Sequence, residues 1–377
     1  MTALPNIPFN RASMVGPELE YIRQAVESGH ISGDGPFTKR CHRLLEETSE
    51  VKKALLTTSC THALEMSALL LDIVPGDEVI VPSFTFVSTP NAFVLRGAKP
   101  VFVDVRPDTL NLDEKQLAAK ISPRTKAICV VHYAGVGCEM DEILAAAGDI
   151  PVVEDNAHGL FGRYRGRALG SFGAMATLSF HETKNLSCGE GGALLLKDER
   201  LLARAEIIRE KGTNRSLFFR GQVDKYGWVD LGSSYLPSDV LAAFLFAQLE
   251  ARVSIQARRR AIWEAYAERL EPWAAKHGVR LPVVPAHVDQ AFHMFYLLLP
   301  SLDKRTAFIA HMKERGIYTP FHYLPLHLST MGTKFGGRVG DCPVTEDVSD
   351  RLARLPLFTA LTDADIDRIV DAAVQFS

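Results

Sequence analysis

Seven short apolar runs alternate with amphipathic stretches between residue 50 and about residue 200, and this alternation constrains the fold more than any other feature. The runs are KALLTTS, DEVIVPS, KPVFVDV, KAICVVHYAG, IPVVEDNAHG, GAMATLSFH and GALLLKD. Their length and texture are typical of strands, whereas intervening stretches such as THALEMSALLLDI have helical spacing. Strands as apolar as ICVV need cover on both faces, so we expect an α/β fold with a mostly parallel, seven-stranded sheet between helices.

The chain has 377 residues, which favours about two domains. After Pro237 the pattern becomes helical, with Ser238 as a candidate N-cap, a break near 251–254 and Gly278 as a stop. The segments beyond it suggest a smaller α+β unit. We therefore expect a large α/β domain over residues 1–250 and a small C-terminal α+β domain over residues 251–377.

Charge and cysteine usage exclude several classes of function. The 42 Lys and Arg residues nearly balance 45 Asp and Glu residues, so no electrostatic footprint for nucleic acid is present. Six cysteines lack zinc-like spacing, which favours reduced thiols in a cytoplasmic protein and predicts no metal site. Neither a signal peptide nor an apolar run of about 20 residues is evident, so we expect no membrane partner.

The first of three suggestive strand ends is TTSCTHALEMSALLL, where a strand runs through Ser59 into a helix that starts near Thr61. Ligands of open α/β sheets bind at the carboxyl ends of the strands. The free N–H groups and the positive end of this helix would suit a phosphate, helped by the two hydroxyls. A plain N-cap explains the same residues without a ligand, so this pattern alone leaves both interpretations open.

Two further strand ends carry acids and a lysine. The strand in VVEDNAHG delivers Glu154 and Asp155, and an acid there could bind a cationic ring nitrogen, ligate a metal or cap a helix. The strand ending in TLSF continues through His181 to Lys184 and then to GEGG. A partly desolvated lysine can act as nucleophile and base because its pKa is lowered, although most lysines are solvated surface charges.

A phosphate turn, a carboxylate and a lysine are the three groups that hold pyridoxal 5'-phosphate, by its phosphate, its ring nitrogen and its aldehyde. An interpretation without a ligand exists for each strand end taken singly. The occurrence of all three strand ends in one chain is much less easily explained by chance. The sequence thus predicts a pyridoxal-phosphate enzyme with Lys184 as the covalent catalyst. The three intact features argue against a non-catalytic or regulatory protein on the same fold.

The sequence resembles the DegT/DnrJ/EryC1/StrS sugar aminotransferases, which have the type I pyridoxal-phosphate fold. The resemblance covers nearly the whole chain and rests on GDGPFTKRC, PGDEVIVPSFTFVST, GAKPVFVDVRPDTLNLDE, VHYAG, VVEDNAHG, SFHETKN, GEGG, REKGTNRSLFFRGQVDKY and FHYLPLH. It looks closest to the branch that makes dTDP-4-amino-4,6-dideoxygalactose. This implies amino transfer from L-glutamate to C4 of a dTDP-linked 4-keto-6-deoxyhexose, by a homodimer with active sites shared between subunits.

Rival activities remain open within the resemblance. A GDP- or UDP-linked sugar or a 3-keto sugar is the near alternative, and pyridoxal-phosphate chemistry on free amino acids is a more distant one. One branch of the family has histidine in place of the lysine and removes a hydroxyl group. This chain has lysine at position 184, so its resemblance to the histidine branch is weaker.

The resemblance also implies roles for single residues. Lys184 matches the Schiff-base lysine, and Asp155 matches the acid that pairs with the pyridine nitrogen. Phe84 matches the aromatic residue that stacks on one face of the ring, and Ala157 is small enough to pack against the other. The residues that match the phosphate-binding positions are Cys60, Thr61 and Ser179.

Other positions depart from the family or concern the substrate. His158 stands where many relatives have Gln beside the 3'-oxygen of the cofactor. Ser234 replaces an Asn that reaches the phosphate from the neighbouring subunit. Residues that could line the sugar-nucleotide cleft are Asn185, Arg215, Arg220, Lys225, Tyr323 and His327. Loop structure and solvated surface charge explain these last residues equally well.

Overall fold

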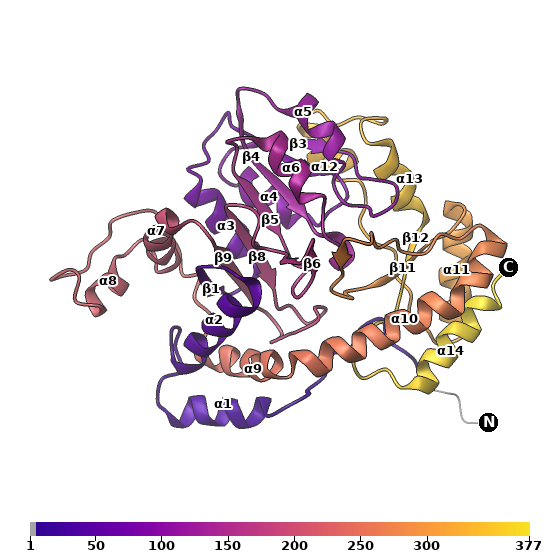
Figure 1. Cartoon of the computed structure of the whole chain (residues 1–377), viewed down its shortest axis with the longest axis horizontal. Helices are drawn as coiled ribbons and strands as arrows, with labels where there is room; N and C mark the ends of the chain where they lie inside the picture. The colour runs from indigo at the N-terminus through magenta and orange to yellow at the C-terminus, as the bar shows by residue number, and fades with distance from the viewer. Residues whose placement is uncertain (1–4) are drawn as a thin grey trace.

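The core of the molecule is a seven-stranded sheet in a computed structural model that describes residues 5–377 (Figure 1). The strands, in sheet order, are β1 (Lys53–Thr57), β9 (Gly192–Leu196), β8 (Met175–Ser179), β5 (Val152–Asp155), β4 (Thr125–Val131), β2 (Glu78–Pro82) and β3 (Lys99–Val103). Only β9 runs against its neighbours, β1 and β8, and the other sheet pairings are parallel. The expected mostly parallel, seven-stranded α/β sheet is confirmed.

Helices cover both faces of this sheet, as its apolar strands require. The helices of this part are α1 (Glu18–Glu27), α2 (Pro36–Ser49), α3 (Cys60–Leu70), α4 (Ser88–Val94), α5 (Leu117–Lys120), α6 (Met140–Ala147), α7 (Glu199–Arg209), α8 (Arg215–Phe219) and α9 (Asp239–Glu250), with short 3-10 turns at Glu114–Gln116 and Tyr133–Gly135. One core contains residues of α3, α4 and α7. Residues of α1, α2 and α9 form a second core, and residues of α5 and α6 form a third. Side chains alternate between the faces of β1, where Leu55 joins the first core while Ala54 and Leu56 join the second.

The C-terminal part begins with a sharp change of direction. Helix α10 (Arg252–His277) follows α9 at an angle of 62° and runs from beneath the sheet toward the C-terminus (Figure 1). Its other elements are β10 (Val288–Asp289), β11 (Phe295–Leu298), α11 (Leu302–Glu314), a 3-10 turn (Leu326–Leu328), α12 (Thr330–Lys334), α13 (Pro343–Arg351), β12 (Leu352–Leu355) and α14 (Asp363–Val374). Strand β10 pairs with β6 (Arg163–Tyr164), which pairs with β7 (Arg167–Ala168), while β11 pairs with β12.

A separate hydrophobic core fills the C-terminal part, and it contains residues from 262 to 373 together with Ile7. On this basis we propose that the chain divides at the bend, into domains of residues 1–250 and 251–377. The local signals at this point behave as expected: Ser238 caps α9 by accepting a hydrogen bond from Leu241 N–H, and Gly278 ends α10 with φ of 66°.

One segment projects from the body. Residues 213–231, which we call the projecting segment, contain α8 and extend away from the sheet beyond α7 (Figure 1). Large apolar side chains on this segment are exposed, including Trp228 at 82% and Phe219 at 69%. Within residues 5–377, no single helix is long and apolar enough to cross a membrane; only α9 and α10 taken together pass that test, across their bend.

Candidate active site

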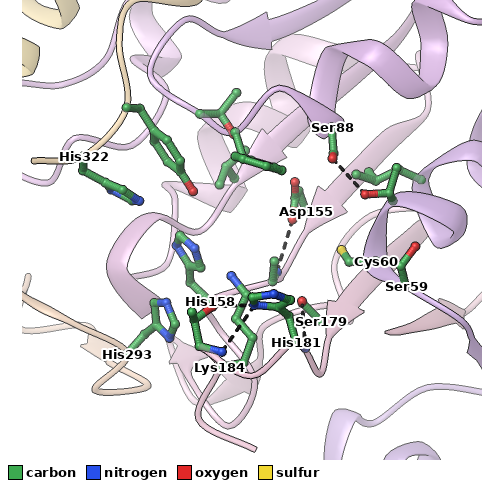
Figure 2. A pocket seen from close by; sticks show the side chains of 18 of the residues that line it. Ser59, Cys60, Ser88, Asp155, His158, Ser179, His181, Lys184, His293 and His322 are labelled. Carbon is green, nitrogen blue, oxygen red and sulfur yellow. Dashed lines mark hydrogen bonds between the residues drawn. The ribbon is translucent and has the colours of Figure 1, made fainter. Parts of the chain in front are cut away.

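A cavity of about 800 Å³ opens at the carboxyl ends of the parallel strands. Figure 2 shows Asp155 and Lys184 within it, with Ser59 and Cys60 on one side and His322 on the other. The predicted site residues that line this cavity are Cys60, Thr61, Asp155, Ala157, His158, Ser179, Lys184 and Tyr323. Three loops far apart in the sequence therefore meet at the carboxyl ends of the parallel strands.

The start of α3 forms one end of the cavity. Ser59 is the N-cap, because its Oγ accepts a hydrogen bond from His62 N–H at 3.1 Å. The N–H groups of Cys60 and Thr61 lie in the first turn, where a helix offers no internal acceptors. The Thr61 hydroxyl lies 2.8 Å from the Ser88 hydroxyl of α4. The cap and a phosphate site are thus compatible, since the cap occupies one N–H and leaves others free.

Gly192 explains the glycine-rich exit of the lysine loop. It starts β9 and pairs with both Thr57 and Ser179, so it lies between the strand ends that lead to α3 and to Lys184. A Cβ on Gly192 would come within 2.3 Å of the Ser59 carbonyl carbon and 2.4 Å of the Cys60 nitrogen. Glycine is required here because the two backbones touch.

The two acids of VVEDNAHG have different surroundings. Glu154 is fully buried and accepts hydrogen bonds from the ring of His132 and from the backbone N–H groups of Gly170, Phe172 and Gly173. Burial raises its pKa, but the bonds from His132 and the backbone outweigh burial and leave that pKa lowered. Glu154 therefore braces the loop after β7, and only Asp155 lines the cavity.

Asp155 is a buried carboxylate with few partners. Its Oδ2 accepts a hydrogen bond from the Thr89 hydroxyl at 2.7 Å, and its Oδ1 accepts one from Ala157 N–H at 3.2 Å. Burial raises the pKa of Asp155, although these bonds and the charge of Lys184 act in the opposite direction. A carboxylate in this state is stabilised by a cationic N–H, which a protonated pyridine ring supplies.

Lys184 lies on the loop between β8 and β9, where its backbone N–H donates to the His181 carbonyl in a tight turn. Its side chain is half-buried and lines the cavity. Burial lowers the pKa of Lys184, and the charge of Arg354 adds to this effect, while the charge of Asp155 opposes it. The amine is thus easier to deprotonate than a surface lysine, which a nucleophile and base requires.

Three histidines form the wall opposite α3. The rings of His158 and His293 stack at 4.2 Å, and the ring of His322 stacks on that of Tyr323 at 3.6 Å. Burial lowers the pKa of all three histidines well below the ordinary value, so all three are neutral at pH 7. Nδ1 of His158 is buried and has no hydrogen-bond partner among residues 5–377. An unpartnered polar nitrogen beside a cavity fits a ligand with an oxygen at this place.

These groups fit pyridoxal 5'-phosphate. In the part of the chain that the structure describes, the first turn of α3 offers free N–H groups, Asp155 has no cation at hydrogen-bond distance, and His158 has an open nitrogen. Lys184 stands among them with a lowered pKa. Each polar group of the cofactor therefore has a complementary side chain or backbone group in one cavity.

Phe84 does not line the cavity, and Phe86 does. Phe84 is 1% exposed and packs on Tyr133, His322 and Tyr323, whereas Phe86 is 55% exposed. The two phenylalanines belong to the same short motif, and the turn after β2 directs the first into the core and the second toward the cavity. The residue available to cover a bound ring is accordingly Phe86 rather than Phe84.

Asn185 and His327 are held by the protein instead of facing the cavity. The Asn185 amide nitrogen donates to Gln256 Oε1 at 3.0 Å and to the Ala291 carbonyl at 2.7 Å. His327 is fully buried, with its ring between Ser83 Oγ at 2.6 Å and Glu346 Oε1 at 3.0 Å. Neither residue lines the large cavity, whereas Asn185 lines a smaller cavity of about 250 Å³ that Lys184 also lines.

The basic residues expected for a sugar nucleotide lie elsewhere in this chain. Arg215 pairs with Glu210 at 3.4 Å, and Arg220 pairs with Glu206 at 2.7 Å, at the two ends of α8. Ser234 is exposed near the base of the projecting segment. None of the three lines the cavity of its own chain. If they reach a site, it belongs to another copy of the chain.

Several residues of the site had no predicted role: Arg354 and His322 line the cavity, and Thr89 lies beside Asp155 without lining the cavity. Thr89 links Asp155 to the Thr85 hydroxyl at 2.9 Å, and Arg354 and His322 come from the C-terminal part. Thr89 stands five residues after Phe84 in the same motif. A helix beginning after the strand would have placed Thr89 in its first turn, near the strand end that carries Asp155. His322 lies within the motif FHYLPLH, which was the available signal, whereas Arg354 lies outside every motif and is 170 residues from Lys184 in the sequence.

Comparisons with known proteins agree with this geometry. Residues 13–374 match the model of the DegT/DnrJ/EryC1/StrS aminotransferase family. An uncharacterized protein of Methanocaldococcus jannaschii is 36% identical, over 97% of this chain and 96% of that protein. The aminotransferase TlmJ of Streptoalloteichus hindustanus is 31% identical with a TM-score of 0.88, over 99% of this chain and 98% of TlmJ.

A further solved relative bears on the cofactor. Spr1654 of Streptococcus pneumoniae, 27% identical, has a pyridoxal-phosphate form with a TM-score of 0.89, covering 98% of both chains. It also has a pyridoxamine-phosphate form with a TM-score of 0.90, covering 98% of this chain and 97% of that one. Family, fold and site thus agree: the chain belongs to the DegT/DnrJ/EryC1/StrS aminotransferase family and is a sugar aminotransferase that uses pyridoxal phosphate.

Proposed function

We propose that this enzyme moves the amino group of L-glutamate to C4 of a dTDP-linked 4-keto-6-deoxyhexose. The observation that carries the proposal is the meeting of Lys184, Asp155 and the first turn of α3 in one cavity. The resemblance of strings such as SFHETKN, GEGG and FHYLPLH to the dTDP-4-amino-4,6-dideoxygalactose branch supports the choice of sugar. Six free cysteines support a cytoplasmic location.

We assign the cofactor contacts as follows. The N–H groups of Cys60 and Thr61 and the hydroxyls of Thr61 and Ser179 hold the phosphate at the positive end of α3. Burial raises the pKa of the Cys60 thiol, so this side chain stays neutral beside an anion. The phosphate is therefore bound largely by dipoles, which orient it without adding a fixed charge near Lys184.

The ring of the cofactor lies between the remaining residues. Asp155 would keep its nitrogen protonated, Phe86 would cover one face, and Ala157 would leave room at the other, since all three residues line the cavity. His158, whose Nδ1 has no partner among residues 5–377, would hydrogen-bond the ring oxygen. The bound cofactor supplies an electron sink for the carbon that gains or loses the amino group.

Lys184 carries the proton transfers. Its side chain lines the cavity, where the amine would be available to move protons whenever it is not bonded to the cofactor. Because burial lowers the pKa of Lys184, the neutral amine is more accessible at neutral pH and can take a proton from that carbon and return it one position away. The same amine serves both halves of the reaction in opposite directions.

We further propose that two copies of the chain form the working enzyme. The projecting segment exposes Phe219 and Trp228, which a solvated loop would not need, and carries Arg215 and Arg220 beside them. A second copy would bury the apolar side chains and receive the cations near the diphosphate of its substrate. Ser234, at the base of the segment, would approach the phosphate of the neighbouring cofactor.

The proposal is tested by separating the two halves of the reaction. The pyridoxal-phosphate enzyme is mixed with L-glutamate, and the absorbance of the lysine-bound cofactor is expected to fall. The pyridoxamine-phosphate enzyme is then given dTDP-, UDP- and GDP-linked 3-keto and 4-keto sugars, and product mass identifies the acceptor. Absorbance unaffected by glutamate contradicts the donor, and amination of another sugar in preference to the dTDP 4-keto sugar contradicts the acceptor.

A further inference from the structure

We propose that Arg354 binds the α-carboxylate of the amino-acid donor, an assignment that rests on the proposed aminotransferase function. Arg354 lies on β12 in the C-terminal part, and its side chain lines the cavity that contains Lys184. No role of this residue follows from the sequence motifs, and it is 170 residues from Lys184 in the chain.

The guanidinium of Arg354 has unused hydrogen-bonding capacity. Its Nη2 donates to the Phe321 carbonyl at 3.0 Å, while its Nε is buried without a partner. Its central carbon lies 4.4 Å from the centroid of the Phe9 ring, which holds the plane of the group in place. A planar fork held by one carbonyl and one aromatic face still has N–H groups for an oxyanion.

The charge of Arg354 is also unmatched. Among residues 5–377, no Asp or Glu forms an ion pair with it. Burial lowers the pKa of Arg354, which reflects the cost of holding a cation away from water without a counter-ion. A substrate carboxylate would supply the missing negative charge at the moment of binding.

The place of Arg354 favours a carboxylate over a diphosphate. Arg354 lines the same cavity as Lys184, His158 and His322, so its guanidinium and the reacting amine face one shared space. In an amino acid the carboxylate is bonded to the carbon that carries the amino group. In a 4-keto sugar nucleotide the whole hexose ring separates the reacting C4 from the diphosphate, which places that charge farther away.

Among the described residues that line the cavity, the other groups able to carry a positive charge are occupied or neutral, and His181 faces Glu190, with 3.7 Å between its Nε2 and Oε1 of the carboxylate. Among the same lining residues, only Lys184 and Arg354 are lysine or arginine, and Lys184 is needed for the cofactor. His158, His293 and His322 are neutral because burial lowers the pKa of each ring. Arg354 is therefore the residue that selects an amino acid over a simple amine as donor.

The test compares Arg354→Gln and Arg354→Lys with the unchanged enzyme loaded with pyridoxal phosphate. The concentration of L-glutamate that gives half-maximal loss of the cofactor absorbance should rise about 10- to 100-fold for Arg354→Gln and less for Arg354→Lys. The rate with isopropylamine, which lacks a carboxylate, should stay unchanged. The reaction of the pyridoxamine-phosphate form with the keto sugar should change by less than about threefold.

Arg305→Gln is the matched control, because the Arg305 guanidinium lies over the Phe321 ring, at 5.7 Å, but does not line the cavity. Arg305→Gln should leave unchanged the half-maximal concentration of L-glutamate, the rate with isopropylamine and the reaction with the keto sugar. Equal losses with L-glutamate and isopropylamine would assign Arg354 a structural role, and a selective loss with the keto sugar would assign it to the nucleotide. Either result overturns the proposal.

Binding of glutarate, measured by calorimetry on the loaded enzyme, separates this inference from the proposed donor. If L-glutamate proves not to be a substrate but Arg354→Gln still weakens glutarate binding about 10-fold or more, the carboxylate site stands and the donor is a different amino acid. If glutarate binds equally to the unchanged enzyme and to Arg354→Gln, the carboxylate site is refuted whatever the donor is.

Discussion

Nδ1 of His293 donates a hydrogen bond to Oδ1 of Asn185, with 2.9 Å between the two atoms. The direction follows from the other contacts of the amide, since the Asn185 nitrogen faces two acceptors, Gln256 Oε1 and the Ala291 carbonyl. The amide oxygen must then face His293, and the histidine nitrogen must carry the proton. The residue next to Lys184 thus sets the tautomer of the ring that stacks on His158.

This relationship predicts a single tautomer for His293. Nitrogen NMR of histidine-labelled protein should show a neutral ring protonated at Nδ1 at pH 7. Burial lowers the pKa of His293. The groups that face its ring lower this pKa further because they are neutral or cationic; they are His158, Lys184, Arg259 and His322. Asn185→Asp should therefore raise the pKa of His293, because a carboxylate stabilises the imidazolium.

Asn185→Leu is the partner variant, which removes the acceptor without adding charge. Without this acceptor, the His293 ring should populate both neutral tautomers, and it should stay neutral. A His293 signal protonated at Nε2 in the unchanged protein would contradict the hydrogen-bond direction given above.

Replacing Lys184 by methionine should abolish amino transfer and stabilise the protein without cofactor. Burial lowers the pKa of Lys184 from its ordinary value of 10.5, so the unfolded chain binds more protons than the folded one between the two values. The free energy of unfolding should rise with pH across this window in the unchanged protein. Lys184→Met should remove that slope and add about 1 kcal/mol at pH 7, measured by urea unfolding.

Thr89→Val should weaken catalysis while leaving the fold intact. The variant removes the hydrogen bond to Asp155 Oδ2, and since that bond lowers the pKa of Asp155, the pKa should rise. We expect kcat to fall about 10-fold, with the acid limb of the pH profile moved to higher pH. Thr89→Ser keeps the donor and should restore both quantities; a profile that does not move in Thr89→Val would show that Thr89 acts only through packing.

Gly192→Ala should disrupt the phosphate end of the site. Its Cβ would meet the Ser59 carbonyl carbon at 2.3 Å, so the start of α3 must shift. We expect the dissociation constant of the cofactor to rise about 10-fold or more, measured by fluorescence titration. Gly16→Ala is the control, because its Cβ would have only an ordinary contact of 3.8 Å with the Ala247 carbonyl.

Trp228→Asp should weaken association of two copies. Trp228 is 82% exposed on the projecting segment, so a charge there costs the isolated chain little but opposes its burial in an interface. Sedimentation velocity should show a shift from dimer toward monomer. Val339→Asp, at an equally exposed position of 81% outside the segment, should leave the mass unchanged. A monomeric unchanged protein would contradict the proposed pair of copies.

The strands and the ends of several helices could be predicted from the sequence because they depend on local chemistry. Apolar runs such as ICVV became strands, Ser59 and Ser238 became N-caps, and Gly278 ended α10 with positive φ. Phe84 shows the limit of this reasoning. Two phenylalanines within one turn have the same local pattern, and only the packing of Tyr133 and Tyr323 decides which of them is buried.

The sequence by itself determined the sheet, its strand ends and the cofactor groups delivered there, since strand period and apolar content act within a few residues. The tertiary structure decided which C-terminal side chains complete the cavity. Arg354 meets Lys184 only because the fold brings β12 to the cavity, and contacts between segments so distant in the sequence leave no local pattern to read.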